Sequence, residues 1–324
     1  DYPTTLYNFF KIYKVVMEVI NLNFFPNGEE EIALIKFVSQ YQYLNTNDAK
    51  YFFKTVDYYK KRIKHLVDKK FIKRSKSYLI LDELGIEYAK LLGFNYNPVN
   101  RNAKYKNRLL NLSNIGAFYH NCKTVKFTPS FSIKDKQTFT TTGRRYIGVF
   151  DINGIEYLGY QIRAEHDEKY IKSIMYDIQK EIKYKNIIIL VNDIKRINFN
   201  DFCFGINQVV VLQDSEENRE KLKYLNSVNW YKIINEFYKN KAYLSEYNFC
   251  DYTDYKNKYI SYFYFLDTEK INRIKYFLRE NENKNIDIIC DSSQKEELSK
   301  VFPNAHYIIL SLEKYIDKER NYYD

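Results

Sequence analysis

The strongest local pattern in the chain is a pair of alternating apolar runs separated by Asn153-Gly154. Asn-Gly between such runs favours a two-residue type I′ turn, because both residues tolerate a positive φ. The runs at 145–152 and 155–162 therefore predict a β-hairpin. The elements expected after it are a helix at 166–184 and buried strands at 186–191 and 208–212.

Strand and helix patterns alternate through the rest of the chain. Short alternating runs at 125–128 and 131–133 predict strands before the hairpin, and helical patterns follow at 216–225 and 229–238. The chain then repeats the order strand, helix, strand, helix, strand. These last elements are expected at 259–265, 268–280, 287–290, 293–301 and 307–310. Such alternation indicates an α/β arrangement with a partly parallel sheet.

The N-terminal part has a different order of elements. Apolar residues at helical spacing predict helices at 4–20 and 29–41, and the second helix has three glutamates in its first turn, where the macrodipole favours them. A turn at 44–48 leads to a short helix at 47–53. A third helix is expected at 58–70, with a single buried stripe formed by Tyr59, Ile63, Leu66 and Val67.

A hairpin follows the third helix. Strand-like pieces at 71–72 and 78–81 enclose the polar tip Arg74–Ser77, and a helix at 82–92 ends at Gly93. Two helices, a short turn, a basic helix and a basic-tipped hairpin are typical of a winged helix-turn-helix. In that motif the third helix lies in the DNA major groove, and the hairpin contacts phosphate or the minor groove.

Charge is concentrated in the first 145 residues. The chain has a net charge of +10. Residues 50–76 hold 11 basic and two acidic residues, and residues 101–145 hold ten basic residues and one acid, whereas residues 146–324 are slightly acidic. A basic segment of this kind points to a polyanionic partner, and we expect duplex DNA.

The basic residues in these two segments are the expected DNA contacts. Most would bind phosphate and position the protein, and Asn47, Thr55, Tyr58 and Arg62 are candidates for contacts with bases or sugars. The expected DNA-binding residues are Lys60, Lys61, Arg62, Lys64, His65, Arg74, Lys76, Arg101, Lys104, Lys126, Lys134, Lys136, Arg144 and Arg145.

Several other classes of chemistry are disfavoured. The chain contains no G-x-x-x-x-G-K-[ST], no G-x-G-x-x-G and no G-x-S-x-G motif, which argues against common nucleotide-dependent enzymes and hydrolases. Cys122, Cys203, Cys250 and Cys290 lack zinc-ligand spacing, and we expect them to be reduced. No secretory leader or membrane-length apolar run is visible, so we expect a cytoplasmic protein without a membrane partner.

The hairpin, helix and buried strand that begin at residue 145 follow the order of the restriction-nuclease-like core. In that core an Asp begins one strand and an acidic-x-Lys triplet lies on the next, where the acids bind Mg²⁺. Here Gln161-Ile162-Arg163 occupies the triplet position, and Gln is a weak neutral ligand for Mg²⁺. Asp151 and Glu165 are possible substitutes without the expected spacing. We therefore expect a nuclease-like domain that is inactive and has no cofactor.

The segments 32–93, with the basic helix Tyr58–Val67, and 145–192 resemble the replication-relaxation family of plasmid and mobile-element proteins. The resemblance implies an amino-terminal winged helix followed by a nuclease-like α/β domain. It implies a role in replication, mobilisation or their regulation, with duplex DNA, a second copy or other replication and transfer proteins as partners. Family members carry an acid on the second hairpin strand, where this chain has Gln161.

These patterns together predict a mixed α+β and α/β fold in two domains. A winged helix-turn-helix domain with an extra N-terminal helix is expected at 1–97, and a nuclease-like α/β domain ending in a βαβαβ unit at 98–324. The linker is expected at 95–102, and a further boundary near 240–258.

Four alternatives to an inactive DNA-binding protein remain open from the sequence. The first is an active Mg²⁺-dependent nickase that uses Asp151 or Glu165. The second is a repressor with a ligand-sensing α/β domain, and the third is a winged helix that binds protein. The fourth is single-strand binding through aromatic side chains, for which the tyrosine-rich stretch 252–264 is the candidate site.

Overall fold

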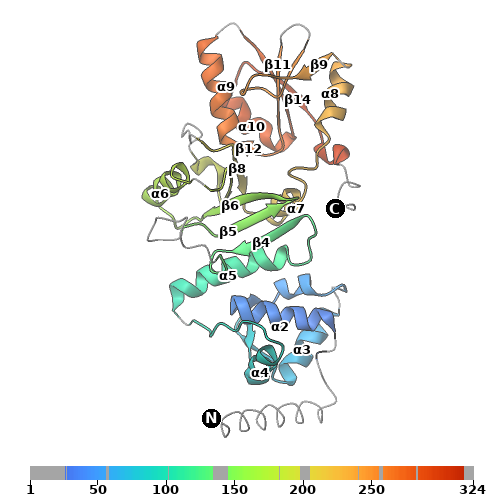
Figure 1. Ribbon diagram of the computed structural model, residues 1–324, viewed down its shortest axis with the longest axis vertical. Helices are drawn as coiled ribbons and strands as arrows, with labels where there is room; N and C mark the ends of the chain where they lie inside the picture. The colour runs from blue at the N-terminus through green and yellow to red at the C-terminus, as the bar shows by residue number, and fades with distance from the viewer. Residues whose placement is uncertain are drawn as a thin grey trace. The chain divides into compact units, whose positions relative to one another are not determined.

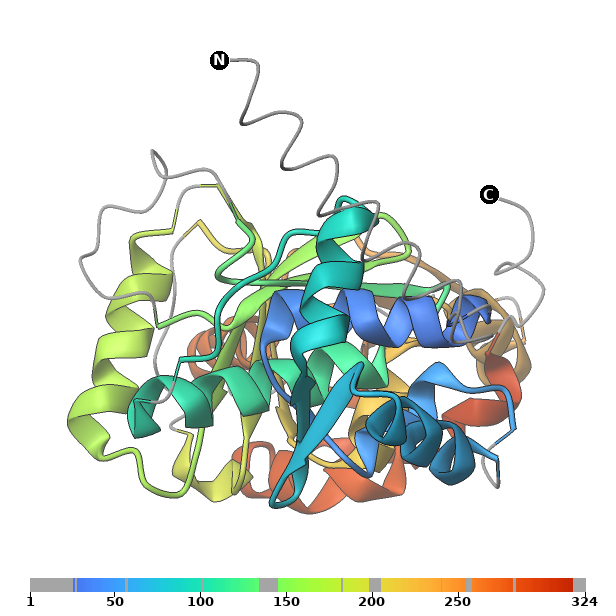
Figure 2. The ribbon, with the colours of Figure 1, turned by 90° about the horizontal axis from the view of Figure 1, so that it is seen from below.

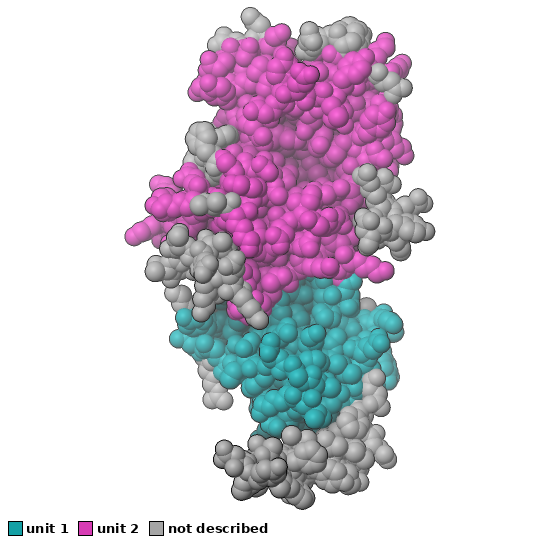
Figure 3. Space-filling view, viewed as in Figure 1, with its two compact units in different colours: residues 1–121 teal, residues 122–324 magenta. Residues whose placement is uncertain are grey.

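The computed structural model describes two compact units, residues 1–121 (unit 1) and 122–324 (unit 2), which Figure 3 shows in different colours. The described residues are 26, 28–55, 58–100, 102–133, 145–181, 183–197, 205–239, 241–254, 258–281 and 284–316, without the side chain of Lys104. They form a mixed α/β fold with nine α-helices and three sheets. The helix expected at 4–20 lies outside the described residues.

Unit 1 begins its described part with α2 (Glu29–Tyr41), whose first turn carries Glu29, Glu30 and Glu31. Gln42 ends the helix with a φ of 69°. A short 3₁₀ helix, η1 (Asp48–Phe52), replaces the α-helix expected at 47–53. The basic helix is α3 (Tyr59–Asp68), which buries Tyr59, Ile63 and Leu66 as its spacing predicts. Val67, the fourth residue of the expected stripe, is only half-buried.

A three-stranded antiparallel sheet follows, in the order β1-β3-β2. Strands β2 (Ile72–Ser75) and β3 (Tyr78–Leu81) confirm the expected hairpin, and Lys76 at its tip has a φ of 59°. Strand β1 (Leu44–Asn45) was expected as part of a turn. Two residues are too few for an alternating pattern, and only the pairing of Leu44 with Leu79 makes them a strand.

The remaining helices complete the core of unit 1. Helix α2 packs against α4 (Glu83–Leu91) and α5 (Ala103–Phe118). The segment expected as a linker returns to the end of α2, where the Asn97 side-chain amide donates to the Gln40 carbonyl and the Asn97 N–H donates to the Ser39 carbonyl. The expected boundary at 97/98 therefore precedes α5, a helix of unit 1.

Helix α4 approaches the chain at Phe71 so closely that only glycine fits at position 85. A Cβ on Gly85 would lie 1.9 Å from the carbonyl oxygen of Phe71. We expect Gly85→Ala to reduce the free energy of unfolding by about 3 kcal/mol, because the backbone must move to relieve the clash. Denaturation followed by circular dichroism measures the change, and the exposed Glu87→Ala on the same helix is the control. Equal stability of the two variants would contradict this packing.

Unit 2 contains a six-stranded sheet in the order β12-β8-β7-β6-β5-β4. Strands β4 (Val125–Pro129), β5 (Gly148–Ile152) and β6 (Ile155–Ile162) form an antiparallel meander that includes the Asn153-Gly154 hairpin. Helix α6 (Glu168–Gln179) connects β6 to β7 (Asn186–Val191), which is parallel to it. Strand β8 (Gln208–Gln213) continues the parallel part. The strand expected at 131–133 is a turn instead, in which Ser132 N–H donates to the Pro129 carbonyl.

The short helix η2 (Ile194–Arg196) lies between β7 and β8 in the chain. Helices α7 (Glu216–Leu222) and α8 (Trp230–Tyr238) follow β8 and precede the second sheet of unit 2. The second sheet has the order β14-β13-β11-β10-β9 and begins at β9 (Ala242–Leu244), which falls within the expected boundary near 240–258. Its other strands are β10 (Tyr252–Asp254), β11 (Tyr259–Phe263), β13 (Ile286–Cys290) and β14 (His306–Ile309).

The expected βαβαβ order is confirmed in this sheet. Helices α9 (Thr268–Glu280) and α10 (Ser292–Val301) connect the parallel strands β11, β13 and β14, and η3 (Leu312–Tyr315) follows. The short strand β12 (Leu266–Asp267) pairs with β8, so this part is hydrogen-bonded to the first sheet. Within the described ranges, no helix has the length and apolar character needed to span a bilayer.

Candidate nucleic-acid interface

Helix α3 separates its apolar and basic residues onto different faces. Tyr59, Ile63 and Leu66 are buried in unit 1, and this burial fixes the rotation of the helix. Lys60, Lys61 and Lys64 are exposed. The apolar stripe therefore determines which lysines reach solvent.

The β2–β3 hairpin lies beside α3, as Figure 2 shows. Arg74 and Lys76 are exposed on the hairpin. Neither they nor the three α3 lysines form an ion pair with another residue in the part of the chain that the structure describes. Lys73 differs, because its ammonium lies 3.2 Å from the Asp82 carboxylate. Five basic side chains on two adjacent elements thus keep their charge without an ion pair to any residue that the structure describes.

Arg62 was expected to contact DNA, and the structure turns it toward the protein. Its guanidinium lies 2.6 Å from the carboxylate of Glu31, whose side chain is 1% exposed, whereas that of Arg62 is 27% exposed. Burial raises the pKa of Glu31, and the charge of Arg62 opposes that shift. The ion pair joins α3 to the first turn of α2 and thereby holds α3 in place.

The expected base or sugar contacts lie around the start of α3. Asn47, Thr55 and Tyr58 are exposed, and the Arg62 guanidinium lies 5.9 Å from the centre of the Tyr58 ring. His65 is half-buried. Asn47 does not cap η1 with its side chain; instead its N–H donates to the side-chain oxygen of Asn45.

Two residues that support this surface were not singled out from the sequence. Glu31 was expected only as a first-turn acid, and nothing in the local pattern indicates that it is buried beneath Arg62. Lys106 on α5 donates a hydrogen bond to the Tyr78 hydroxyl at the start of β3, which lowers the pKa of that phenol. Both contacts join segments that are far apart in the sequence, so only the tertiary structure reveals them.

The second basic segment, residues 101–145, is divided between the two units, because unit 1 ends at residue 121. Lys126 is exposed on β4 of unit 2, opposite Asp151 on β5. The guanidinium of Arg145 donates to both carboxylate oxygens of Asp177, at 2.7 and 2.9 Å, so it serves the packing of α6. Arg101, Lys134, Lys136 and Arg144, and the side chain of Lys104, lie outside the described residues.

The position where a metal-binding triplet was expected from the sequence is occupied by an internal polar network. Gln161 on β6 is buried, and its amide donates to the Asp214 carboxylate at 2.8 Å. Asp214 in turn lies 2.7 Å from the guanidinium of Arg219. The negative charge of Asp214 is therefore balanced by Arg219. In a metal site, such a carboxylate would instead bind the metal ion.

The other nuclease candidates do not join Gln161. Asp151 pairs with Glu156, five residues before Gln161 on β6, which is about 16 Å along the strand. Its carboxylate accepts the Gly154 N–H in the hairpin turn. Arg163 and Glu165 form an ion pair with each other at 3.0 Å. Among the described residues, no three His, Cys, Asp or Glu side chains come together as a metal site.

Comparison with known proteins adds no relative. A scan of protein-family models, a search of curated proteins and a search of solved structures each found no match to this chain.

Proposed function

We propose that unit 1 is a winged helix-turn-helix module that binds duplex DNA through α3 and the β2–β3 hairpin. Support comes from the order α2, β1, η1, α3, β2, β3 and from the sheet order β1-β3-β2, in which the hairpin extends beyond a helical core. An α-helix with its side chains is about 10–12 Å wide, which matches the major groove of B-DNA.

The observation that carries the proposal is the set of exposed cations Lys60, Lys61, Lys64, Arg74 and Lys76. Uncompensated cations on adjacent elements repel one another, and a row of phosphates relieves that repulsion while releasing counterions from the DNA. Lysines act as point charges on phosphate and carry little base information. The proposal is therefore duplex binding with a strong dependence on salt.

The hairpin tip provides the first test. We expect Arg74→Ala with Lys76→Gly to weaken binding to a 20-base-pair duplex by about 30-fold at 150 mM salt, because two phosphate contacts are lost. Glycine at position 76 removes the charge and suits the positive φ of that residue. Fluorescence anisotropy from about 50 to 300 mM salt measures the affinity. The slope of log affinity against log salt should become less negative by about two.

Lys73→Ala is the matched control for the hairpin, since Lys73 on β2 already pairs with Asp82, the N-cap residue of α4. It should change the affinity less than threefold. If the tip variant also retained its affinity and salt slope, the hairpin would not contact DNA.

We further propose that the nuclease-like arrangement of unit 2 acts as a scaffold without metal chemistry. The hydrogen bond from Gln161 to Asp214 and the distant position of Asp151 support this. We expect a supercoiled plasmid to be shifted in a gel but not nicked in 5 mM Mg²⁺, a concentration of the order that Mg²⁺-dependent enzymes use. Nicking that is lost in Asp151→Ala or Glu165→Ala would contradict this proposal and favour the nickase.

A further inference from the structure

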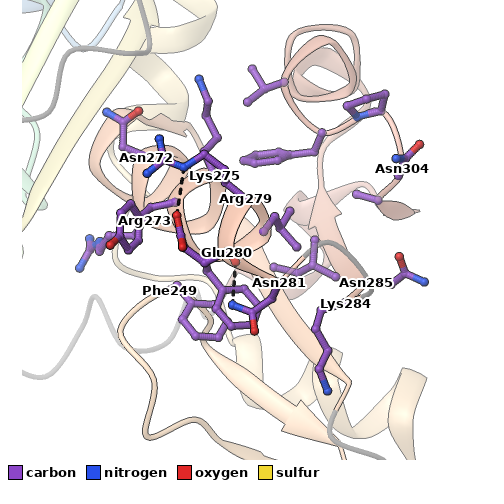
Figure 4. A pocket seen from close by; sticks show the side chains of 18 of the residues that line it. Phe249, Asn272, Arg273, Lys275, Arg279, Glu280, Asn281, Lys284, Asn285 and Asn304 are labelled. Atoms are coloured by element: carbon purple, nitrogen blue, oxygen red, sulfur yellow. Dashed lines mark hydrogen bonds and ion pairs between the residues drawn. The ribbon is translucent and has the colours of Figure 1, made fainter.

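A cavity of about 1230 Å³ lies in the C-terminal part of unit 2, and Figure 4 shows it from close by. It is lined by the C-terminal half of α9, the end of α10 and the start of β13. Asn304 lies across the cavity from the α9 side chains. Drug-sized ligands occupy about 300 to 1000 Å³, so the space suits an occupant longer than one such molecule. The proposed duplex interface does not include this cavity.

The described lining is basic. Arg273, Lys275, Arg279 and Lys284 line the cavity, against the single acid Glu280. Arg273 donates to the carbonyls of Glu269 and Asn207 and so retains its charge. The C-terminal ends of α9 and α10 each contribute roughly half a negative charge. Four cations, one carboxylate and two helix ends still leave an excess of about two positive charges, which favours an anionic occupant.

Aromatic side chains line the same cavity. Phe249 and Phe277 stack, with ring centroids 3.7 Å apart and an angle of 9° between the ring planes. Tyr276 is 64% exposed, and the Arg279 guanidinium lies 5.2 Å from the centre of its ring. The Arg279 guanidinium also lies 3.2 Å from the carboxylate of Glu280, and both side chains are exposed, so a phosphate can compete with Glu280 for it. The exposed ring and this guanidinium together offer a stacking face and a cation within the reach of a single nucleotide.

Side-chain amides supply the polar contacts that bases need. Asn285 and Asn304 are exposed on the lining, and each amide offers both donors and acceptors. Asn281 donates to the Phe277 carbonyl, as Figure 4 shows, and keeps its amide oxygen as an acceptor. Lipid or simple carboxylate ligands would not use this set of amides.

We propose that this cavity binds single-stranded nucleic acid over a few nucleotides. Such sites combine cations that contact the phosphates of the strand with exposed aromatic rings that stack on its bases. Here side-chain amides can also form hydrogen bonds with the edges of the bases. The tyrosine-rich stretch 252–264 does not provide them, because Tyr252 and Tyr259 are buried and Tyr262 stacks on Trp230 at 3.9 Å. The single-strand site thus lies on α9, outside the tyrosine-rich segment.

The test is the binding of a fluorescein-labelled ten-nucleotide dT strand to the full chain at 150 mM salt, followed by anisotropy. Tyr276→Ala with Arg279→Glu and Lys284→Glu should weaken strand binding about 30-fold or more, since one stacking contact and two phosphate contacts are lost. The same variant should bind a 20-base-pair duplex within about twofold of the unaltered protein, because α3 and the hairpin are unchanged. This pair of results supports a single-strand site on α9.

Tyr231→Ala with Lys232→Glu and Lys239→Glu is the matched control, because it removes an exposed tyrosine and reverses two exposed lysines on α8 and at its C-terminal end, away from the cavity. It should leave strand binding unchanged. An unaltered affinity of the α9 variant for the strand overturns the proposal. Complete displacement of the strand by about 1 mM AMP also overturns the proposal, because a site for a single small nucleotide would then explain the cavity. A strand that is held at several contacts should resist a competitor at about this concentration.

Discussion

Reversing the charge of Lys60, Lys61 and Lys64 together to glutamate should weaken duplex binding by about 100-fold or more at 150 mM salt. Each phosphate contact lowers the slope of log affinity against log salt by about 0.9, which corresponds to roughly fivefold in affinity per contact at this salt concentration. Three lost contacts give about 100-fold, and repulsion between glutamates and phosphates adds to it. The salt slope should become less negative by about three, since the three contacts no longer contribute.

The control has the same change of charge in a place that should not touch DNA. Lys169, Lys172 and Lys180 are exposed along α6 and its C-terminal end in unit 2. Their replacement by glutamate alters the net charge equally, so a general electrostatic effect would weaken both variants alike. Equal losses in the two variants would contradict a localised interface on α3, and no loss in either would rule out DNA binding by this helix.

Arg62→Met should destabilise unit 1 by about 2 to 3 kcal/mol at neutral pH, although Arg62 stands among the basic residues of α3. Removing one partner of a buried ion pair leaves the other charge without compensation, and here the remaining charge is Glu31, which is 1% exposed. Removing one partner of a fully buried pair usually costs about 3 to 5 kcal/mol. The loss of stability should be at or below the lower end of that range, because Arg62 is itself partly exposed.

Glu31→Gln should cost less than Arg62→Met, since Arg62 can turn to solvent whereas Glu31 cannot. Glu31→Leu combined with Arg62→Met should recover much of the loss, because an apolar pair fills the same space without a charge. Hydrogen exchange at the α3 amides measures the stability of unit 1 directly. The single tryptophan, Trp230, lies in unit 2, so its fluorescence provides an internal control that should not change.

The pH dependence of Arg62→Met distinguishes an internal ion pair from a DNA contact. Without Arg62, the pKa of Glu31 should rise further above its ordinary value, because burial is no longer opposed. The folded state then binds a proton more tightly than the unfolded chain, so stability falls as pH rises through the window between the two pKa values. The deficit of the variant should therefore shrink when pH is lowered toward 5. A deficit independent of pH would contradict this account.

The sequence was most informative where a local pattern repeats. The stripe of Tyr59, Ile63, Leu66 and Val67 predicted α3 and its buried face, of which only Val67 is half-buried. Asn153-Gly154 predicted the β5–β6 hairpin. Strand β1 was not predicted, because its two residues are too few to show an alternation of apolar and polar side chains. The helix expected at 166–184 is shorter at both ends, since α6 begins after the Asp167 side chain caps it and ends at Gln179.

Net charge also followed from the sequence, but the role of each charge did not. Lys60, Lys64 and Arg62 look alike in sequence, and only Arg62 meets a buried carboxylate. Arg145 was expected on the DNA surface and instead pairs with Asp177, 32 residues away. An ionised side chain pairs with an opposite charge that the fold places near it. The order of residues in the chain does not reveal which residue that partner is.

The sequence by itself determined most of the longer helices and strands among the described residues, because helix and strand periods depend on residues only a few positions apart. It also determined that the N-terminal part is basic and the C-terminal part is not. The tertiary structure alone decided which cations face solvent, that Asp151 lies far from Gln161, and that α9 carries an aromatic, basic cavity. Each of these depends on contacts between residues distant in the chain, where packing and strand register set the distances.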